Sequence, residues 1–309
     1  MNHLLPRSLS FLPSCPILAS VAAVLLAALP LNGLAQGIGD GPRENPYADM
    51  PLIKAAEAAD FNSFAQTGGL AAPEIAMSGL PGAPVVVELF TSQGCSSCPP
   101  ADAMLGELVD EPGVLPLSFH VDYWDYLGWA DEFAQPEFTE RQQNYALSAG
   151  ERTVYTPQMI VGGQDTAPSL RPAELMAMID AHRASPATIS VQETEQGDKT
   201  LIELTPLSDL GGPVAVSLVR FAPSRTVEVK GGENRGRLIV YHNVVLDLQQ
   251  LAEWNGHETL RLMIGTGDSA DATGGEEFPE DTRHAILIQR VSGAKAQMPG
   301  PMLTALQLD

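Results

Sequence analysis

The stretch PVVVELFTSQGCSSCPPADAMLGELV, residues 84–109, decides the fold that we predict for this chain. It begins with PVVVELF, a largely apolar and β-branched run that is typical of a strand buried on both faces. TSQG follows as a turn, and the segment from Cys98 onward then has the spacing of a helix. The apolar positions on one side of that helix are Ala101, Met104, Leu105 and Leu108.

Cys95 and Cys98 lie at the junction of the predicted strand and helix. A helix N-terminus directs unpaired N–H groups and the positive end of its dipole at the first sulfur, which lowers the pKa of that thiol. The second cysteine, almost one turn later, can close a disulfide or resolve a mixed one. We therefore expect Cys95 to be an exposed nucleophile and Cys98 to be the more buried, resolving thiol.

The same two cysteines could instead form a purely structural disulfide, called a staple below, or bind a metal ion. A loop with two residues between its cysteines removes little chain entropy, so a staple there stabilises little. Two thiolates with a histidine can bind Cu(I) or Zn(II), and His120 is a nearby candidate in a strand-like apolar run. We expect instead that His120 is a core histidine with satisfied hydrogen bonds.

The chain begins with the pattern of a secretory signal peptide. In residues 1–35, the single charged side chain is Arg7, a largely apolar run of 13 residues occupies 17–29, and small residues precede a cleavage point after Ala35. Cys15 would leave with this segment. We thus expect an exported, periplasmic or extracellular protein with no membrane span after cleavage, in a compartment where disulfides persist.

Composition limits the partners. The 309 residues carry 17 Lys and Arg against 38 Asp and Glu, a net charge of −21, which would be repelled by a nucleic acid backbone. The residues at 36–82 are rich in Gly, Pro and Ala and are interpreted as a flexible arm. The Gly-rich acidic stretch 267–281 is interpreted as a loop.

Two folded domains are expected after the signal peptide and the flexible arm. Residues 83–185 alternate strand and helix patterns, with strands at 114–121 and 156–163 and helices at 136–150 and 171–183, which predicts an α/β domain. After Ser185 the pattern becomes a series of strand-length segments separated by short turns. Residues 186–309 are therefore predicted to form a separate, β-rich, sandwich-like domain.

Three segments of the first domain and one of the second resemble a known family. These are VVVELFTSQGCSSCPPAD, SFHVDYWDYLGWADEFAQPEFTERQQNYA, VYTPQMIVGG and GGENRGRLIVYHNVV. They are similar to the secreted, thioredoxin-like family catalogued as domain of unknown function 1223. The resemblance implies export and a thioredoxin-like fold, in which a central mixed sheet is flanked by helices, but no known substrate. Ser96 and Ser97 depart from the Gly-Pro of thioredoxin itself.

The same resemblance gives Pro157 a role. In thioredoxin-like folds a cis-proline before a strand faces the cysteine pair, and the residue before it, here Thr156, offers backbone groups to an extended substrate. A trans proline that starts an edge strand is the alternative. The third predicted catalytic residue, after Cys95 and Cys98, is therefore Pro157.

An aromatic insert, residues 120–133, separates the second strand from the next helix. Tyr123, Trp124 and, further along, Tyr155 could form a wall that binds a peptide or carbohydrate beside Cys95, or could simply cap the sheet. Asp122 could transfer protons to or from a cysteine, or be a solvated loop carboxylate. His242 is interpreted as structural, and GGENRGR (231–237) as a tight turn or an anion-binding nest.

The leading prediction is an exported thiol–disulfide oxidoreductase that needs no cofactor or metal. Its partners would be protein or small-molecule thiols and disulfides, or a redox partner protein, and not a nucleic acid. One alternative is a copper- or metal-binding chaperone that uses the same two thiols. The other is a non-enzymatic module that binds peptide or carbohydrate through its aromatic insert and β domain.

Overall fold

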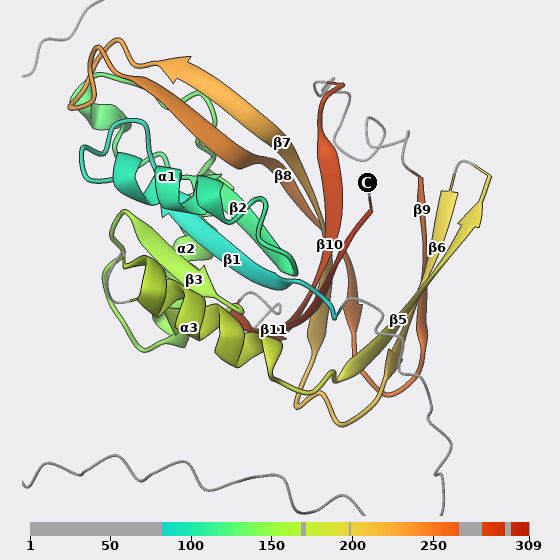
Figure 1. The fold of residues 1–309 in the computed structure, drawn as a ribbon. Helices are drawn as coiled ribbons and strands as arrows, with labels where there is room; N and C mark the ends of the chain where they lie inside the picture. The colour runs from blue at the N-terminus through green and yellow to red at the C-terminus, as the bar shows by residue number, and fades with distance from the viewer. Residues whose placement is uncertain (1–81, 168–170, 198, 266–279, 294–297, 309) are drawn as a thin grey trace, which may run out of the picture. The chain divides into compact units, whose positions relative to one another are not determined.

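Strands dominate the part of the chain described by the structure, a computed structural model that covers residues 82–167, 171–197, 199–265, 280–293 and 298–308 (Figure 1). The predicted signal peptide (1–35), all of the predicted arm except Gly82, and most of the acidic stretch 267–281 lie outside the described residues. Within the described residues, no helix is long and apolar enough to cross a membrane.

The described elements follow one another in this order: β1 (Val85–Thr91), α1 (Pro99–Glu107), β2 (Val114–His120), the 3-10 turn η1 (Asp125–Leu127), α2 (Pro136–Ser148), β3 (Gln158–Val161), β4 (Asp165–Thr166), α3 (Pro172–Arg183), β5 (Ile189–Gln196), β6 (Lys199–Pro206), β7 (Val214–Glu228), β8 (Leu238–Trp254), β9 (Leu260–Gly265), β10 (Arg283–Ser292) and β11 (Met298–Gln307). The three predicted helices are confirmed as α1, α2 and α3. Each begins with a proline in its first turn, where the missing N–H leaves no intrahelical bond unmade.

Two sheets hold all of these strands. The large sheet has eight strands in the order β11-β10-β7-β8-β2-β1-β3-β4, and the small one has the order β5-β6-β9. In the large sheet β1 pairs with β2 in parallel and with β3 in antiparallel fashion. The strands of the two halves of the chain meet where Ser118 of β2 pairs in parallel with Val244 of β8.

The prediction of a helix-flanked thioredoxin-like domain (83–185) followed by a separate β-rich, sandwich-like domain (186–309) is therefore wrong. Strands β7, β8, β10 and β11 of the second half extend the sheet that β1, β2 and β3 of the first half begin. The strand patterns are local, whereas the pairing of β8 with β2 is a contact between segments more than 100 residues apart. No local periodicity encodes such a pairing.

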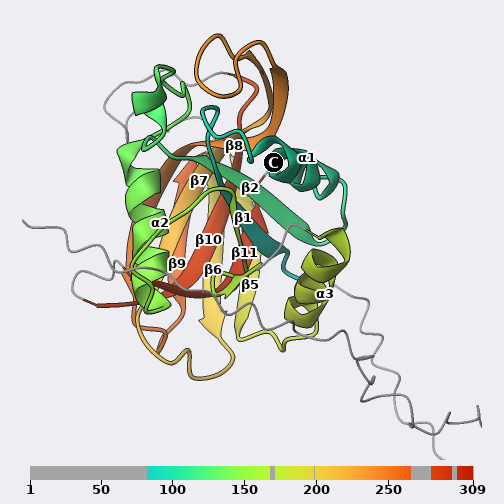
Figure 2. The ribbon, with the colours of Figure 1, turned by 90° about the vertical axis from the view of Figure 1, so that its left-hand side faces the viewer.

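The core confirms that the halves are continuous. One cluster of buried side chains joins Phe90 and Phe119 of the first half to Val219, Phe221 and Leu287 of the second. Helix α2 packs on this cluster, whereas α1 and α3 pack on the opposite face of β1, against Leu89 and its neighbours. Figure 2 shows α2 on one side of the strands and α1 and α3 on the other.

A buried polar network also crosses the boundary. Glu88 of β1 accepts a hydrogen bond from Arg141 Nε at 2.7 Å and another from the Tyr145 hydroxyl, both from α2. Gln289 of β10 donates to that hydroxyl at 2.8 Å and accepts from Arg141 at 3.0 Å. An uncompensated Glu88 would be costly in the core, so this network fixes α2 against strands from both halves.

Two strands differ from the sequence pattern. β7 is one strand of 15 residues that runs through Pro223, a residue type that usually interrupts a strand. β11 was not predicted because Pro299, Gly300 and Pro301 interrupt its sequence. It lies at the edge of the large sheet, the position where prolines are tolerated because only one side of the strand must supply hydrogen bonds.

Candidate functional site

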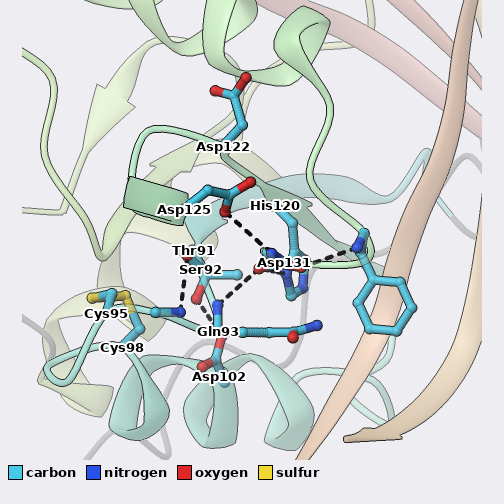
Figure 3. Close-up of polar contacts among 12 residues, drawn as sticks. Thr91, Ser92, Gln93, Cys95, Cys98, Asp102, His120, Asp122, Asp125 and Asp131 are labelled. Atoms are coloured by element: carbon cyan, nitrogen blue, oxygen red, sulfur yellow. Dashed lines mark hydrogen bonds and ion pairs between the residues drawn. A yellow bond between two sulfur atoms is a disulfide. The ribbon is translucent and has the colours of Figure 1, made fainter. Parts of the chain in front are cut away.

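The two cysteines lie where the chain leaves β1 and enters α1. Cys95 and Cys98 form a disulfide, with their Cα atoms 5.4 Å apart, and Cys98 is the N-cap residue of the helix. A turn closes the loop before it, because the Cys95 N–H donates to Ser92 O at 3.1 Å and the Gly94 N–H donates to Ser92 Oγ at 3.1 Å. We call residues 92–98 the disulfide loop (Figure 3).

The expectation that Cys95 is exposed is wrong for this oxidised form. Cys95 is 1% exposed and Cys98 is fully buried, whereas Ser96 and Ser97 between them are exposed. Trp124 lies against the loop, since a Cβ atom added to Gly94 would stand 3.2 Å from Trp124 Cβ. The sequence pattern located the loop but could not show that the aromatic insert covers it.

A second segment that covers the disulfide loop comes from the second half of the chain. The hairpin tip that joins β7 to β8, residues 229–237, reaches the disulfide loop and places Asn234 inside it. Asn234 is fully buried, and its Nδ2 donates to Gln93 O at 2.9 Å and to Cys95 O at 2.8 Å. The Ser96 N–H donates to Glu233 at 3.3 Å. GGENRGR does form a tight turn, and its asparagine also positions the disulfide loop.

Asp102 is a buried carboxyl group one helical turn beyond Cys98. Residues four apart on a helix lie on the same face, and the Asp102 N–H donates to Cys98 O at 3.1 Å. Its Oδ1 accepts from the Thr91 hydroxyl at 2.7 Å, and only 3% of the residue is exposed. Burial raises the pKa of Asp102 from 3.8 to about 7, against the smaller opposing effects of Thr91 and the nearby His120.

A buried histidine–carboxylate pair lies beside Asp102. His120 Nδ1 is 2.7 Å from Asp131 Oδ2, and both side chains are inaccessible to solvent. Burial raises the pKa of Asp131, but the charge and hydrogen bond of His120 and the N–H groups of Gln93 and Phe133 outweigh it and lower the pKa below its ordinary value. Asp131 is thus a carboxylate that only accepts, so Nδ1 of His120 carries the hydrogen. The prediction of a buried core histidine is confirmed, but its other nitrogen, Nε2, has no partner among the described residues.

The Thr156–Pro157 bond is cis, as predicted. Gln158 pairs with Phe90, so Pro157 lies at the same end of the sheet as Thr91 and the disulfide loop that follows it. Thr156 Oγ1 accepts from Trp124 Nε1 at 2.7 Å. Because Trp124 also lies against Gly94, the predicted binding residues Thr156 and Trp124 do meet beside the disulfide loop.

The other predicted residues are more dispersed. The Tyr123 hydroxyl donates to Gln142 at 3.2 Å, and burial raises the pKa of Tyr123 to about 12. Tyr155 is 45% exposed. Asp122 accepts from the Thr139 hydroxyl of α2 at 2.6 Å, and Figure 3 shows its carboxylate pointing away from the disulfide. The aromatic insert therefore both caps the sheet and touches the disulfide loop.

A surface groove of about 670 Å³ begins next to the disulfide, at Pro99, and runs between α1 and β8. Gly106 forms part of its wall on α1, and the His242 ring stands so close that a Cβ on Gly106 would meet it at 2.7 Å. On β8, Leu238 is 70% exposed and Val240 is 44% exposed. His242 thus packs against α1 as a structural residue would, at the edge of a groove that the sequence did not reveal.

Within the described residues, no group of three or more His, Cys, Asp or Glu side chains is arranged to hold a metal ion. His120 in particular is directed by its Nδ1 to Asp131.

Comparisons with known proteins agree with the resemblance found in the sequence. A model of the family described as "Protein of unknown function (DUF1223)" matches residues 86–279. The chain belongs to this family. The matched segment contains the disulfide loop, Asp102, the aromatic insert and the hairpin tip. The secreted and thioredoxin-like attributes that the resemblance implied are not part of this finding.

Two solved structures are similar. Protein AGR_C_4864 from Agrobacterium tumefaciens is 32% identical over 74% of this chain and 94% of its own, with a TM-score of 0.58. HBP35 of Porphyromonas gingivalis is 15% identical over 74% of this chain and 75% of its own, with a TM-score of 0.51, a likeness of fold alone. A comparison with curated proteins found no match.

Sequence reasoning missed three residues of the site: Asp102, Asp131 and Asn234. Asp102 had a usable signal, because it is an acidic residue four positions after Cys98, on the buried side of a predicted helix that otherwise carries apolar side chains. Asp131 and Asn234 had none, since each reaches the disulfide loop from a distant loop of the chain.

Proposed function

We propose that this protein is an exported thiol–disulfide oxidoreductase whose redox centre is the Cys95–Cys98 disulfide. The single observation that carries the proposal is the buried Asp102 on the same face of α1 as Cys98, directly after the disulfide at the start of the helix. A disulfide that served only as a staple would close a loop too short to stabilise the fold much. It would also gain nothing from a buried acid beside it.

The reaction supported by this arrangement is exchange with a substrate thiol. A substrate thiolate attacks Cys95 Sγ, the bond between Sγ of Cys95 and Sγ of Cys98 breaks, and its electron pair goes to Cys98. Cys98 is fully buried, so its thiolate cannot be solvated and needs a proton from nearby. Asp102, with a pKa of about 7, can give that proton and take it back in the reverse reaction. We assign proton transfer to Asp102 in place of Asp122.

The surroundings support a substrate larger than a free thiol. Thr156 and the cis-proline Pro157 lie beside the disulfide loop, and the groove between α1 and β8 starts at Pro99. Because both cysteines are buried, the attack on Cys95 requires Trp124 or the hairpin tip to move. The signal-peptide pattern of residues 1–35 supports export. The mass of the mature protein would show whether the chain is cleaved after Ala35.

Alkylation trapping in buffers of defined thiol and disulfide content tests the proposal. We expect a reversible two-electron couple, and we expect the Cys98→Ser variant to accumulate a mixed disulfide through Cys95. The matched Cys95→Ser variant should accumulate none. A disulfide that resists excess strong reductant in the native protein would overturn the proposal. Stoichiometric Cu(I) that stays bound on dialysis, and is lost in Cys95→Ser, would favour the metal-binding alternative.

A further inference from the structure

Three buried polar atoms beside α1 have no hydrogen-bond partner among the described residues: Asp102 Oδ2, His120 Nε2 and the Tyr241 hydroxyl. They come from three elements, α1, β2 and β8. Each residue is at most 3% exposed, so bulk water does not satisfy these atoms. Buried polar groups in folded proteins nearly always have a partner, which makes three such atoms in one region informative.

The three side chains are close to one another. The rings of His120 and Tyr241 have centroids 4.7 Å apart in an edge-on arrangement. Asp102 accepts a hydrogen bond from Thr91, and Thr91 is the partner of His120 in the pairing of β1 with β2, so the Asp102 carboxyl lies beside His120. The charge of Asp102 also adds to the larger effect of burial in raising the pKa of Tyr241, which agrees with this arrangement.

The remaining groups around Asp102 are accounted for. Thr91 of β1 donates to its other oxygen, Oδ1, and Asp131 holds the Nδ1 hydrogen of His120. His242 of β8 lies one helical turn further along, against Gly106. The disulfide lies one turn before it. Besides burial, the charge of Asp131 also raises the pKa of Asp102, and Oδ2 of Asp102 has no hydrogen-bond partner among the described residues.

The donors and acceptors of the three atoms match one water molecule. With its ring hydrogen on Nδ1, His120 can accept at Nε2, an ionised Asp102 accepts at Oδ2, and the Tyr241 hydroxyl donates. A water that donates two hydrogens and accepts one satisfies all three, which is the usual number of bonds for a buried water. We infer that Asp102, His120 and Tyr241 form a buried site for one ordered water that stabilises the Asp102 carboxylate after its proton has passed to Cys98.

The inference rests on the proposed function for its role in the reaction. When the disulfide bond breaks and the electron pair goes to Cys98, one proton moves from the Asp102 carboxyl to that sulfur. Asp102 then carries the negative charge in a buried place, where the water would donate a hydrogen bond to it and accept one from Tyr241. The proton returns to Asp102 when the disulfide forms again.

Tyr241→Phe tests the site, because it removes only the hydroxyl group. In the oxidised wild-type protein, ¹³C NMR of the Asp102 carboxyl should give a titration midpoint near 7. In Tyr241→Phe that midpoint should rise by about 0.5 to 1 pH unit, the size expected for the loss of one hydrogen bond to the charged form. Tyr126→Phe, at a tyrosine that is 79% exposed, is the matched control and should not move it.

The rate of disulfide reduction is the second readout. For the wild type and for Tyr241→Phe, the reduction rate at each pH is divided by the rate of the same protein that also carries Asp102→Asn. This division cancels the titration of the reductant. This ratio should exceed one at low pH and fall toward one as the pH rises through the Asp102 midpoint. In Tyr241→Phe the fall should occur at higher pH. Equal midpoints in wild type and Tyr241→Phe, or a ratio that is flat with pH, would overturn the inference while leaving the oxidoreductase intact. A disulfide that cannot be reduced would instead defeat the proposed function, and the NMR titration would still decide the water site.

Discussion

Asn234→Ala should destabilise the protein by about 2 to 4 kcal/mol, because Asn234 is the main link between the hairpin tip and the disulfide loop. Its amide donates two hydrogen bonds, to Gln93 O and Cys95 O, and all three residues are at most 1% exposed. Two lost bonds account for about 1 to 3 kcal/mol at the usual net value. Leaving the buried Gln93 carbonyl without this donor adds to that loss, whereas the Cys95 carbonyl keeps its bond from the Cys98 N–H.

The assay is urea unfolding of the oxidised protein, followed by tryptophan fluorescence and compared at equal m-values. Asn234→Asp should be worse than Asn234→Ala, because a carboxylate cannot donate and would face two carbonyl oxygens. Asn255→Ala is the matched control: Asn255 is exposed, and its side chain accepts a bond from the nearby His257 N–H, so the change should stay within about 0.5 kcal/mol.

The reasoning fails if Asn234→Ala unfolds at the same urea concentration as the wild type. Such a result would mean that the hairpin tip does not hold the disulfide loop and that the burial of Cys95 has another origin. If the reasoning holds, Asn234→Ala should also be reduced faster by small thiols, since the tip that covers Cys95 is loosened.

Three further predictions follow from the same contacts. Glu88→Ala should lower the free energy of unfolding by about 3 to 5 kcal/mol, because it leaves the largely buried Arg141 without its carboxylate partner, and Glu88→Gln should cost less; an effect as small as that of a surface mutation would contradict the network. Between pH 3.8 and about 7, Asp102 in the folded protein holds a proton that the unfolded chain releases. The free energy of unfolding should therefore fall as pH rises, by up to about 1.4 kcal/mol per pH unit. Urea titrations across that range should show that Asp102→Asn flattens this fall. A fragment of residues 83–185 should lack a cooperative unfolding transition, because Phe90 and Phe119 lose the side chains of β7 and β10 that cover them; dispersed NMR signals from that fragment would show that the halves fold separately.

The local pattern was sufficient for the elements that pack against their neighbours in sequence. The run PVVVELF predicted β1, whose residues Val85–Thr91 are all buried, and the helix after Cys98 buries Ala101 and Leu105 as its spacing predicted. Thr156-Pro157 could be placed beside the cysteines because a known family carries the same motif there. These features depend on period, capping and short connections, which a sequence contains directly.

The sequence by itself thus determined most of the elements, the position of the cysteine pair and the family. Only the tertiary structure decided that β8 pairs with β2 and that both halves share one sheet, since strand pairing depends on which distant edge is free and which apolar faces fit. The same holds for the site. Asn234 and Asp131 reach the disulfide loop from loops 139 and 38 residues distant from their partners Cys95 and Gln93. A buried contact of that kind arises from the packing of whole helices, strands and loops, and no residue spacing along the chain predicts it.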